Sequence, residues 1–415
     1  MWASGNDPNS AMTLSTQQRE GTPGEVLAAF LKLGFTSFGG PIAHIGYFRE
    51  AFVVRRKWLD ETAFADLVAL CQFLPGPASS QVGFSLGLMR GGWLGGLAAW
   101  AAFTLPSAVA LLLFACVENV LTGRVAEGVL HGLKLVAVAI VAQAVWGMAT
   151  SLCPDRRRAG IAVFSLALVT VLGGSVGQIA AIALGGCAGV ILCRAAPVVD
   201  GGHLPAIPVS RTIGIVLLIV FAVLLVVPPM VLSGPLRSQT LALFDAFYRS
   251  GALVFGGGHV VLPLLREAVV TPGWITADSF LAGYGATQAA PGPLFTFAAY
   301  LGFVMTPAPN GIAGAALALV AIFLPGLLLV TGALPFWDAF RRRPTAQAAM
   351  RGTNAAVVGV LGAALYNPVW ISAVIAPSDF AIVATGFALL TVWRWAPLVV
   401  VVAMTVATAG LHGVM

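Results

Sequence analysis

Long apolar segments without a charged residue recur along the chain, separated by short polar stretches. They cover residues 91–117, 135–154, 159–193, 212–236, 303–337, 352–378 and 395–415. A helix needs about 20 apolar residues to cross a bilayer, so each segment is long enough for a spanning helix and two are long enough for a pair. The pattern predicts an all-α polytopic membrane protein, whose first half has spanning helices at about 92–116, 128–150, 159–173 and 176–194.

Helix-breaking residues interrupt two other apolar stretches. Residues 38–50 read FGGPIAHIGYFRE, and residues 71–81 read CQFLPGPASSQ. Broken backbone is tolerated at membrane depth only where protein buries it or where it lines a wet cavity. The segments 62–74 and 78–89 are each too short to span, which predicts a re-entrant hairpin. The stretch 38–81 is therefore a candidate binding site.

The same landmarks return in the second half of the chain. Phe255-Gly256-Gly257 echoes Phe38-Gly39-Gly40, and 288–293 (QAAPGP) echoes 72–77 (QFLPGP). The offset is 217 residues before the basic loop at 49–57, 216 after it and 219 by Leu324-Pro325. Such near-constant spacing indicates internal duplication. The predicted organisation is a disordered polar tail at 1–22, a first repeat at 23–196, a linker with one extra helix at 197–236, and a second repeat at 237–415.

The positive charges predict how the repeats are oriented. With the 49–57 loop in the cytoplasm and 62–90 treated as a hairpin, fourteen loop cations fall inside and three fall outside. Cytoplasmic loops carry such an excess of Lys and Arg. The extra helix at 212–232 starts the second repeat on the opposite side, so the repeats are predicted to be inverted, with about 10–13 membrane elements. Inverted repeats with broken helices are typical of secondary transporters.

Composition excludes several other classes of protein. The 415 residues are 59% hydrophobic and 9% charged, with a net charge of +6, whereas soluble domains carry about 25% charged residues. The cations serve topology, so no nucleic-acid partner is predicted. A P-loop motif does not occur in the sequence, so ATP does not drive transport within this chain. The five cysteines form no CxxC pair, and neither a metal nor another cofactor is predicted.

Four cations lie within apolar segments, where a charge is costly. Lys32 and Arg249 are separated by the repeat offset of 217, while Lys134 and Arg351 fall near the aligned helices 128–150 and 345–366. Such a pseudo-symmetric set suits an anion pathway, with Lys32 and Arg249 as the primary pair. The alternative is that the long side chains reach out to the membrane interface, which applies most to Lys134 and Arg351.

The Pro-Gly-Pro motif of the first repeat precedes three polar residues. Proline suits the first turn of a helix, and hydroxyls and free N–H groups there bind oxyanions. The second repeat has Phe295-Thr296-Phe297 in place of the polar residues, so the first repeat is predicted to contact the substrate directly. A purely structural kink is the alternative. The predicted binding set also contains Gly39, Gly40, His44, Gln72, Pro75, Gly76, Pro77, Ser79, Ser80 and Gln81, and from the second repeat Gly256, Gly257, His259, Gln288, Pro291, Gly292 and Pro293.

Several further residues are candidates for proton coupling or gating. His44 and His259 follow the glycine motifs and could donate to an oxyanion or titrate, although a packing role explains them equally well. Asp66 and Asp245 lie deepest in apolar sequence and are candidate proton carriers, unless they simply pair with a nearby cation. The loop-edge pairs Arg49-Glu50 and Arg266-Glu267 could gate through ion pairs or could simply be solvated.

One enzyme motif occurs but lacks its context. Residues 83–87 (GFSLG) fit GxSxG, which in hydrolases follows a strand and has Asp and His partners. Here the motif lies in an apolar helix, so an intramembrane hydrolase is a remote alternative and the chain is not predicted to be an enzyme.

With these motifs in view, the chain resembles the CHR family of chromate ion transporters, in its long two-domain bacterial form. The match rests on residues 38–50, 55–83 (RRKWLDETAFADLVALCQFLPGPASSQVG) and 101–108 (AAFTLPSA), and in the second half on 255–263 (FGGGHVVLP) and 285–302 (GATQAAPGPLFTFAAYLG). The resemblance implies proton-coupled efflux of chromate across the bacterial inner membrane, giving chromate resistance. Sulfate is also a tetrahedral dianion, so a sulfate permease is the main alternative. The predicted partners are such an oxyanion and the lipid bilayer, and a homodimer is left open.

Overall fold

The computed structural model describes residues 21–38, 40–118, 124–193, 209–234, 238–255, 258–340 and 343–414. Within these ranges the chain is helical and contains no strand, as the apolar pattern predicts. Gly39, Gly256 and Gly257 of the predicted binding set lie outside the described residues, as does most of the polar tail.

The described residues of the first repeat form seven α-helices and one π-helical segment, η1 (Arg49–Arg55), which extends α2. The α-helices are α1 (Pro23–Thr36), α2 (Gly40–Phe48), α3 (Glu61–Phe73), α4 (Ala78–Glu118), α5 (Arg124–Leu152), α6 (Arg156–Leu172) and α7 (Gly174–Leu192). The extra helix that the sequence predicts is α8 (Arg211–Leu232).

The second repeat follows the same order with more interruptions. Its first part contains α9 (Gln239–Ala252), η2 (Gly258–Val260), α10 (Val261–Leu265), η3 (Arg266–Val270), α11 (Ala277–Ala289), η4 (Leu294–Thr296), α12 (Phe297–Val304) and α13 (Gly311–Ala333). Its second part contains η5 (Leu334–Phe336), α14 (Trp337–Phe340), α15 (Pro344–Ala364), η6 (Leu365–Trp370), α16 (Ile371–Ala373), α17 (Pro377–Thr391) and α18 (Pro397–Val414).

Equivalent residues begin equivalent helices in the two repeats. The side chain of Asp60 accepts a hydrogen bond from Ala63 N at the start of α3, and Thr276 does the same for Ser279 N at the start of α11. Asp60 and Thr276 are separated by the repeat offset of 216. Short polar side chains at this position satisfy N–H groups that the helix itself leaves unpaired, so the sequence of each repeat fixes the same start.

The long helix α4 is bent back on itself at Gly91 and Gly92, whose backbone angles are not helical. A Cβ atom at Gly87 would collide with the carbonyl oxygen of Gly95, so only glycine lets the two halves lie this close. Gly302 of α12 meets Gly314 of α13 in the same way. The two short segments predicted before residue 90 are thus present as α3 and the first half of α4, and the predicted long helix follows the bend.

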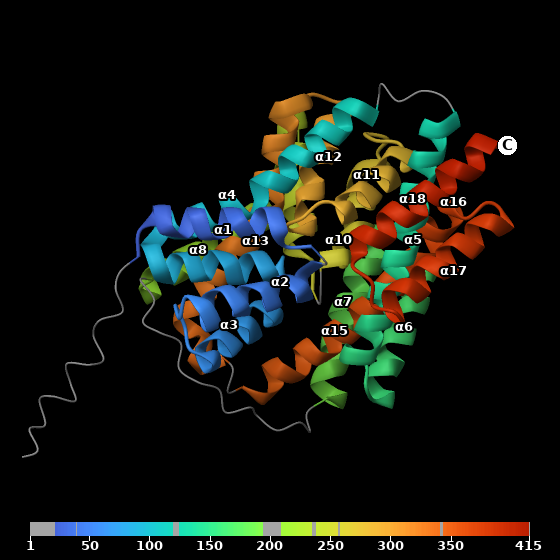
Figure 1. Cartoon of the computed structure of the whole chain (residues 1–415). Helices are drawn as coiled ribbons and strands as arrows, with labels where there is room; N and C mark the ends of the chain where they lie inside the picture. Colours follow the sequence, from blue (N-terminus) through green and yellow to red (C-terminus); the bar gives the residue numbers. More distant parts are fainter. Residues whose placement is uncertain are drawn as a thin grey trace, which may run out of the picture.

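The two repeats do not form two separate bundles. Helices α1 and α4 of the first repeat pack in one region with α8, α9, α12 and α13, while α5, α6 and α7 pack in another with α15, α17 and α18. Figure 1 shows these groups side by side, with the short α2 and α10 helices between them. Each repeat therefore contributes its first part to one group and its second part to the other, and the broken motifs lie where the groups meet.

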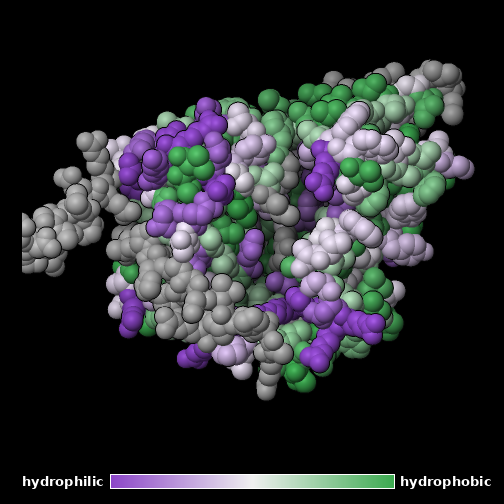
Figure 2. Space-filling model, turned by 60° about the horizontal axis from the view of Figure 1, so that its bottom comes forward, coloured by the Kyte–Doolittle hydropathy of each residue, from purple (hydrophilic) through white to green (hydrophobic). Residues whose placement is uncertain are grey.

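The surface has the apolar character that a bilayer requires. Five described helices are long and apolar enough to span a membrane, and among them α8 buries almost none of its apolar residues. Ile215, Ile219 and Val226 of α8 are each at least half exposed. Hydrophobic residues also gather along the edges of the face seen in Figure 2, outside its hydrophilic patches. Exposed apolar area on this scale marks a lipid-facing surface, and the protein is a multi-pass membrane protein.

The close approach of α9 to α13 gives a prediction about stability. A Cβ atom at Gly251 would collide with the carbonyl oxygen of Ile322, whereas Gly147 on α5 has open space around it. We expect Gly251→Val to lower the free energy of unfolding by roughly 1–3 kcal/mol because the helices must separate. Thermal unfolding in detergent measures the change, and Gly147→Val is the matched control. Equal unfolding temperatures for the two variants would contradict this packing.

Candidate functional site

Two backbone hydrogen bonds cross between the repeats at the broken motifs. Gly76 N donates to Val254 O at 2.7 Å, and Gly292 N donates to Ser37 O at 2.9 Å. Gly76 and Gly292 are equivalent in the repeat alignment, and so are Ser37 and Val254. Each Pro-Gly-Pro loop therefore bonds to the end of the first helix of the other repeat, and such reciprocity is the mark of a two-fold relation.

Glycine is required at the centre of both loops. Gly76 has a φ of +123° and Gly292 a φ of +101°, a region that residues with a Cβ rarely adopt. A Cβ at Gly76 would lie 3.0 Å from the Cα of Gly326, and one at Gly292 would lie 2.8 Å from Ser107 Oγ. Ser107 and Gly326 are themselves separated by the repeat offset of 219. Each loop is thus pressed against the proline-containing helix of the other repeat.

Polar side chains of the first repeat contact the backbone where the two repeats cross. Gln81 Nε2 donates to Pro75 O and to Gly326 O, both at 3.0 Å. His44 is fully buried, with Nε2 3.2 Å from Ser37 O and Nδ1 3.4 Å from Ser79 Oγ. Ser80 is also buried. In this conformation Gln81 and His44 contact backbone carbonyls, whereas Ser80 Oγ has no hydrogen-bond partner among the described residues.

A small polar cavity lies beside the second loop, and we call it the crossed-loop cavity. Its volume is about 40 Å³. Residues of both repeats line it, including Gly40, Pro41, Gln143, His259, Thr287, Gln288 and Gly292. Because most of these polar groups belong to the second repeat, that repeat contributes more of the cavity wall than the polar Ser79-Ser80-Gln81 segment does.

Two side chains of this cavity can donate hydrogen bonds to a ligand. Gln288 Nε2 is buried and has no hydrogen-bond partner among the described residues. His259 Nδ1 lies 2.7 Å from Tyr284 Oη. If the phenol donates in that bond, the ring proton resides on Nε2, which is then available to a ligand. Two such neutral donors, in a cavity that no described Lys or Arg lines, would bind an oxyanion by hydrogen bonds.

The four predicted cations lie elsewhere and do not converge. Arg249 lines a separate cavity of about 380 Å³ together with Asp245, 3.9 Å away. Its counterpart Lys32 is exposed on α1. Lys134 Nζ forms an ion pair with Asp278 at 2.6 Å, and Arg351 lines a third cavity. Charge in the sequence therefore marks several places along the molecule rather than one pocket.

The candidate acids and loop pairs are mostly engaged with neighbours. Arg49 pairs with Glu61 at 2.5 Å, and Glu50 pairs with Arg55 at 2.8 Å, all at exposed positions. Glu267 accepts a hydrogen bond from Thr271 Oγ1 at 3.1 Å. Asp66 is buried, and Arg266 is partly buried. The Arg49 and Glu50 side chains thus bond to other partners than to each other.

Two residues of the site, the cavity-lining Gln143 and Tyr284, which contacts His259, were not predicted although the sequence carries a signal for each. Tyr284 precedes Gln288 by four residues on α11, which places both on one helix face. Gln143 is a polar residue within a long apolar run, and such residues often mark a functional site.

Ser85 of the GxSxG motif is buried inside α4 with its hydroxyl unbonded among the described residues, so the context of a nucleophile elbow is missing.

Comparison with known sequences identifies the family. Residues 24–190 and 241–411 match the family described as chromate transporter. The chain belongs to the chromate transporter family. The two matched segments lie within the two repeats inferred from the motif spacing, and together they cover most of the chain. No solved structure matches this chain.

Several relatives match most of the chain. A chromate transport protein of Pseudomonas aeruginosa is 29% identical over 405 residues, which cover 93% of this chain and 91% of that protein. A probable chromate transport protein of Synechococcus elongatus is 29% identical over 342 residues, or 81% of this chain and 82% of that protein. An uncharacterized transporter of Methanocaldococcus jannaschii is 26% identical over 322 residues, or 76% and 77%.

The asymmetry between the repeats gives a prediction about ligand binding. Gln288 lines the crossed-loop cavity, whereas its counterpart Gln72 is exposed. We expect Gln288→Ala to weaken chromate binding by about 10- to 100-fold, since a hydrogen bond to a charged group is lost. Gln72→Ala, the matched control, should change binding far less. Chromate titration of purified protein by calorimetry measures both, and an equal effect of the two substitutions would contradict the assignment.

Proposed function

We propose that the chain is a secondary transporter that exports chromate and binds the dianion in the crossed-loop cavity. The observation that carries this proposal is the buried Gln288 amide, which has no hydrogen-bond partner among the described residues and lines a cavity formed by both repeats. Leaving a buried donor unpaired is unfavourable, and a ligand oxygen would remove that cost. The relatives described as chromate transport proteins support chromate as the cargo.

The size of the cavity implies that the protein must move to accept its substrate. A water needs about 10–15 Å³ of such space, so a cavity of about 40 Å³ holds about three waters, whereas a tetrahedral oxyanion has four oxygen atoms. In this proposal the described conformation is closed around the site. Separation of the Gly292 loop from Ser37 opens one route, and separation of the Gly76 loop from Val254 opens the other. Two such breaks, made in turn, give alternating access.

The Asp245–Arg249 pair is our candidate for proton coupling. The carboxylate of Asp245 is 3.9 Å from the guanidinium and both line a cavity of about 380 Å³. Protonation of Asp245 would remove its attraction for Arg249. In the proposed cycle Asp245 takes up a proton from the outside after chromate has been released there and gives it up to the cytoplasm before chromate binds again, so that one proton enters the cell as chromate leaves. This cycle places the protein in the bacterial inner membrane and would confer chromate resistance.

A sulfate permease is the second candidate. Neutral donors such as Gln288 and His259 recognise charge and tetrahedral shape, which sulfate shares with chromate.

Everted membrane vesicles test the proposed function directly. With an acid lumen, we expect chromate to accumulate inside vesicles that contain the wild-type protein, and a protonophore should abolish the accumulation. Asp245→Asn should reduce it by at least about tenfold because the proposed carrier is lost. Failure of the wild-type vesicles to accumulate chromate would refute export. Complete suppression by equimolar sulfate would favour the permease.

A further inference from the structure

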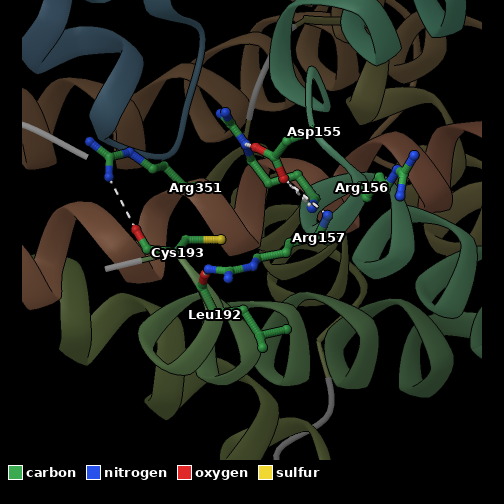
Figure 3. A pocket seen from close by; sticks show the side chains of 7 residues that line it. Asp155, Arg156, Arg157, Leu192, Cys193 and Arg351 are labelled. Atoms are coloured by element: carbon green, nitrogen blue, oxygen red, sulfur yellow. Dashed lines mark hydrogen bonds and ion pairs between the residues drawn. The ribbon is translucent and has the colours of Figure 1, made fainter. Parts of the chain in front are cut away.

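A separate cavity of about 410 Å³ lies at the ends of α6, α7 and α15. Four arginines line it: Arg156, Arg157, Arg158 and Arg351. Asp155 and the last residues of α7 complete the wall. Figure 3 shows Arg351 entering from α15 on one side and Arg157 from α6 on the other, both toward the end of α7. We call this the arginine pocket.

Backbone carbonyls and one carboxylate hold the guanidinium groups in place. Arg157 donates to Leu192 O at 3.0 Å, and Arg351 donates to Cys193 O at 3.2 Å. These carbonyls belong to the end of α7, where the helix leaves its C=O groups unpaired and where cations are favourable. Arg158 Nε donates to Asp155 Oδ2 at 2.6 Å. The positions of three arginines are thus set by the fold rather than by solvent alone.

The pocket keeps a strong positive charge. Backbone N–H groups of Arg157 and Arg158 also donate to Asp155, and the N–H and guanidinium of Arg158 hold the pKa of this carboxyl below its usual range. Asp155 is therefore ionised at neutral pH, and the side chains that line the pocket carry a net charge of +3. A guanidinium has five N–H donors, and the described bonds use only one of Arg157 and two of Arg351. The unused N–H donors and the uncompensated positive charge both favour the binding of an anion.

Apolar surface lies directly beside this charge. Ile191 is 74% exposed and Leu192 is 40% exposed at the end of α7. The positive-inside rule assigns Arg156, Arg157 and Arg158 to the cytoplasmic end of the molecule. Basic pockets between membrane helices at that level suit a phospholipid head group, whose acyl chains lie along the apolar flank.

We propose that the arginine pocket binds the phosphate group of an anionic phospholipid. A phosphate offers several acceptor oxygens to a guanidinium fork, which is the geometry that arginine recognises best. Bound lipid would link α6, α7 and α15 at one end of the molecule. This site is independent of the proposed chromate site, so failure of one does not bear on the other.

The test uses full-length protein purified in detergent. Native mass spectrometry would compare retention of phosphatidylglycerol with that of phosphatidylcholine, and calorimetry with inorganic phosphate would test the same chemistry free in solution. We expect wild-type protein to prefer phosphatidylglycerol, and Arg157→Gln/Arg351→Gln to weaken its binding by about tenfold or more. Arg156 lines the same pocket but makes neither of the two carbonyl contacts. Arg156→Gln therefore leaves the contacts between the helices intact, so that weaker lipid binding by this variant is not explained by misfolding.

Arg55→Gln is the matched control, because Arg55 is an exposed arginine paired with Glu50 in a different loop. It should leave the lipid preference unchanged. Equal retention of phosphatidylglycerol by the wild type, both pocket variants and the control would overturn the proposal. Binding of inorganic phosphate without any preference for phosphatidylglycerol would also overturn it, since the anion would then come from solution.

Discussion

The two crossed hydrogen bonds between the repeats are the constraint on which the rest of the structure depends. Each Pro-Gly-Pro loop ends one broken helix, begins another and donates its central N–H to the opposite repeat. This arrangement requires that α1 and α9 stop where they do, that Gly76 and Gly292 adopt positive φ, and that the proline-containing helices approach closely. Backbone that would be costly at membrane depth is thereby paired within the protein. Each broken helix is stabilised because the other repeat supplies a hydrogen-bond partner for its backbone.

This constraint also explains why the candidate site consists of hydrogen-bond donors rather than charges. Burying an unpaired cation between the repeats would cost far more than burying an amide. The crossed-loop cavity accordingly presents Gln288 and His259, while Arg249 is accompanied by Asp245 and Lys134 by Asp278. Neutral donors can bind a dianion and release it again, which a transporter must do in every cycle. The arginine pocket at the ends of α6 and α15 belongs to a different region, and we propose that it binds a lipid head group.

Much of the fold follows from the sequence because apolar length, helix breakers and repeat spacing are local signals. The hairpin before residue 90, the extra helix α8 and the equivalence of the two halves were all predicted in this way. The details of the site depend on long-range packing, which no local signal reports. His44 and His259 both follow a glycine motif, yet one holds Ser37 and the other lines the cavity. The interleaving of the repeats into two helix groups was likewise not visible in their order along the chain.

The most direct test of this account is the position of the bound anion. Anomalous scattering from chromium, measured on crystals of the protein grown with chromate, locates the metal centre without reference to any assumed site. The account predicts a peak in the crossed-loop cavity, with chromate oxygens within hydrogen-bond distance of Gln288 Nε2 and with the Gly292 loop displaced to make room. A peak beside Arg249 or Lys32, with none near Gln288, would contradict it.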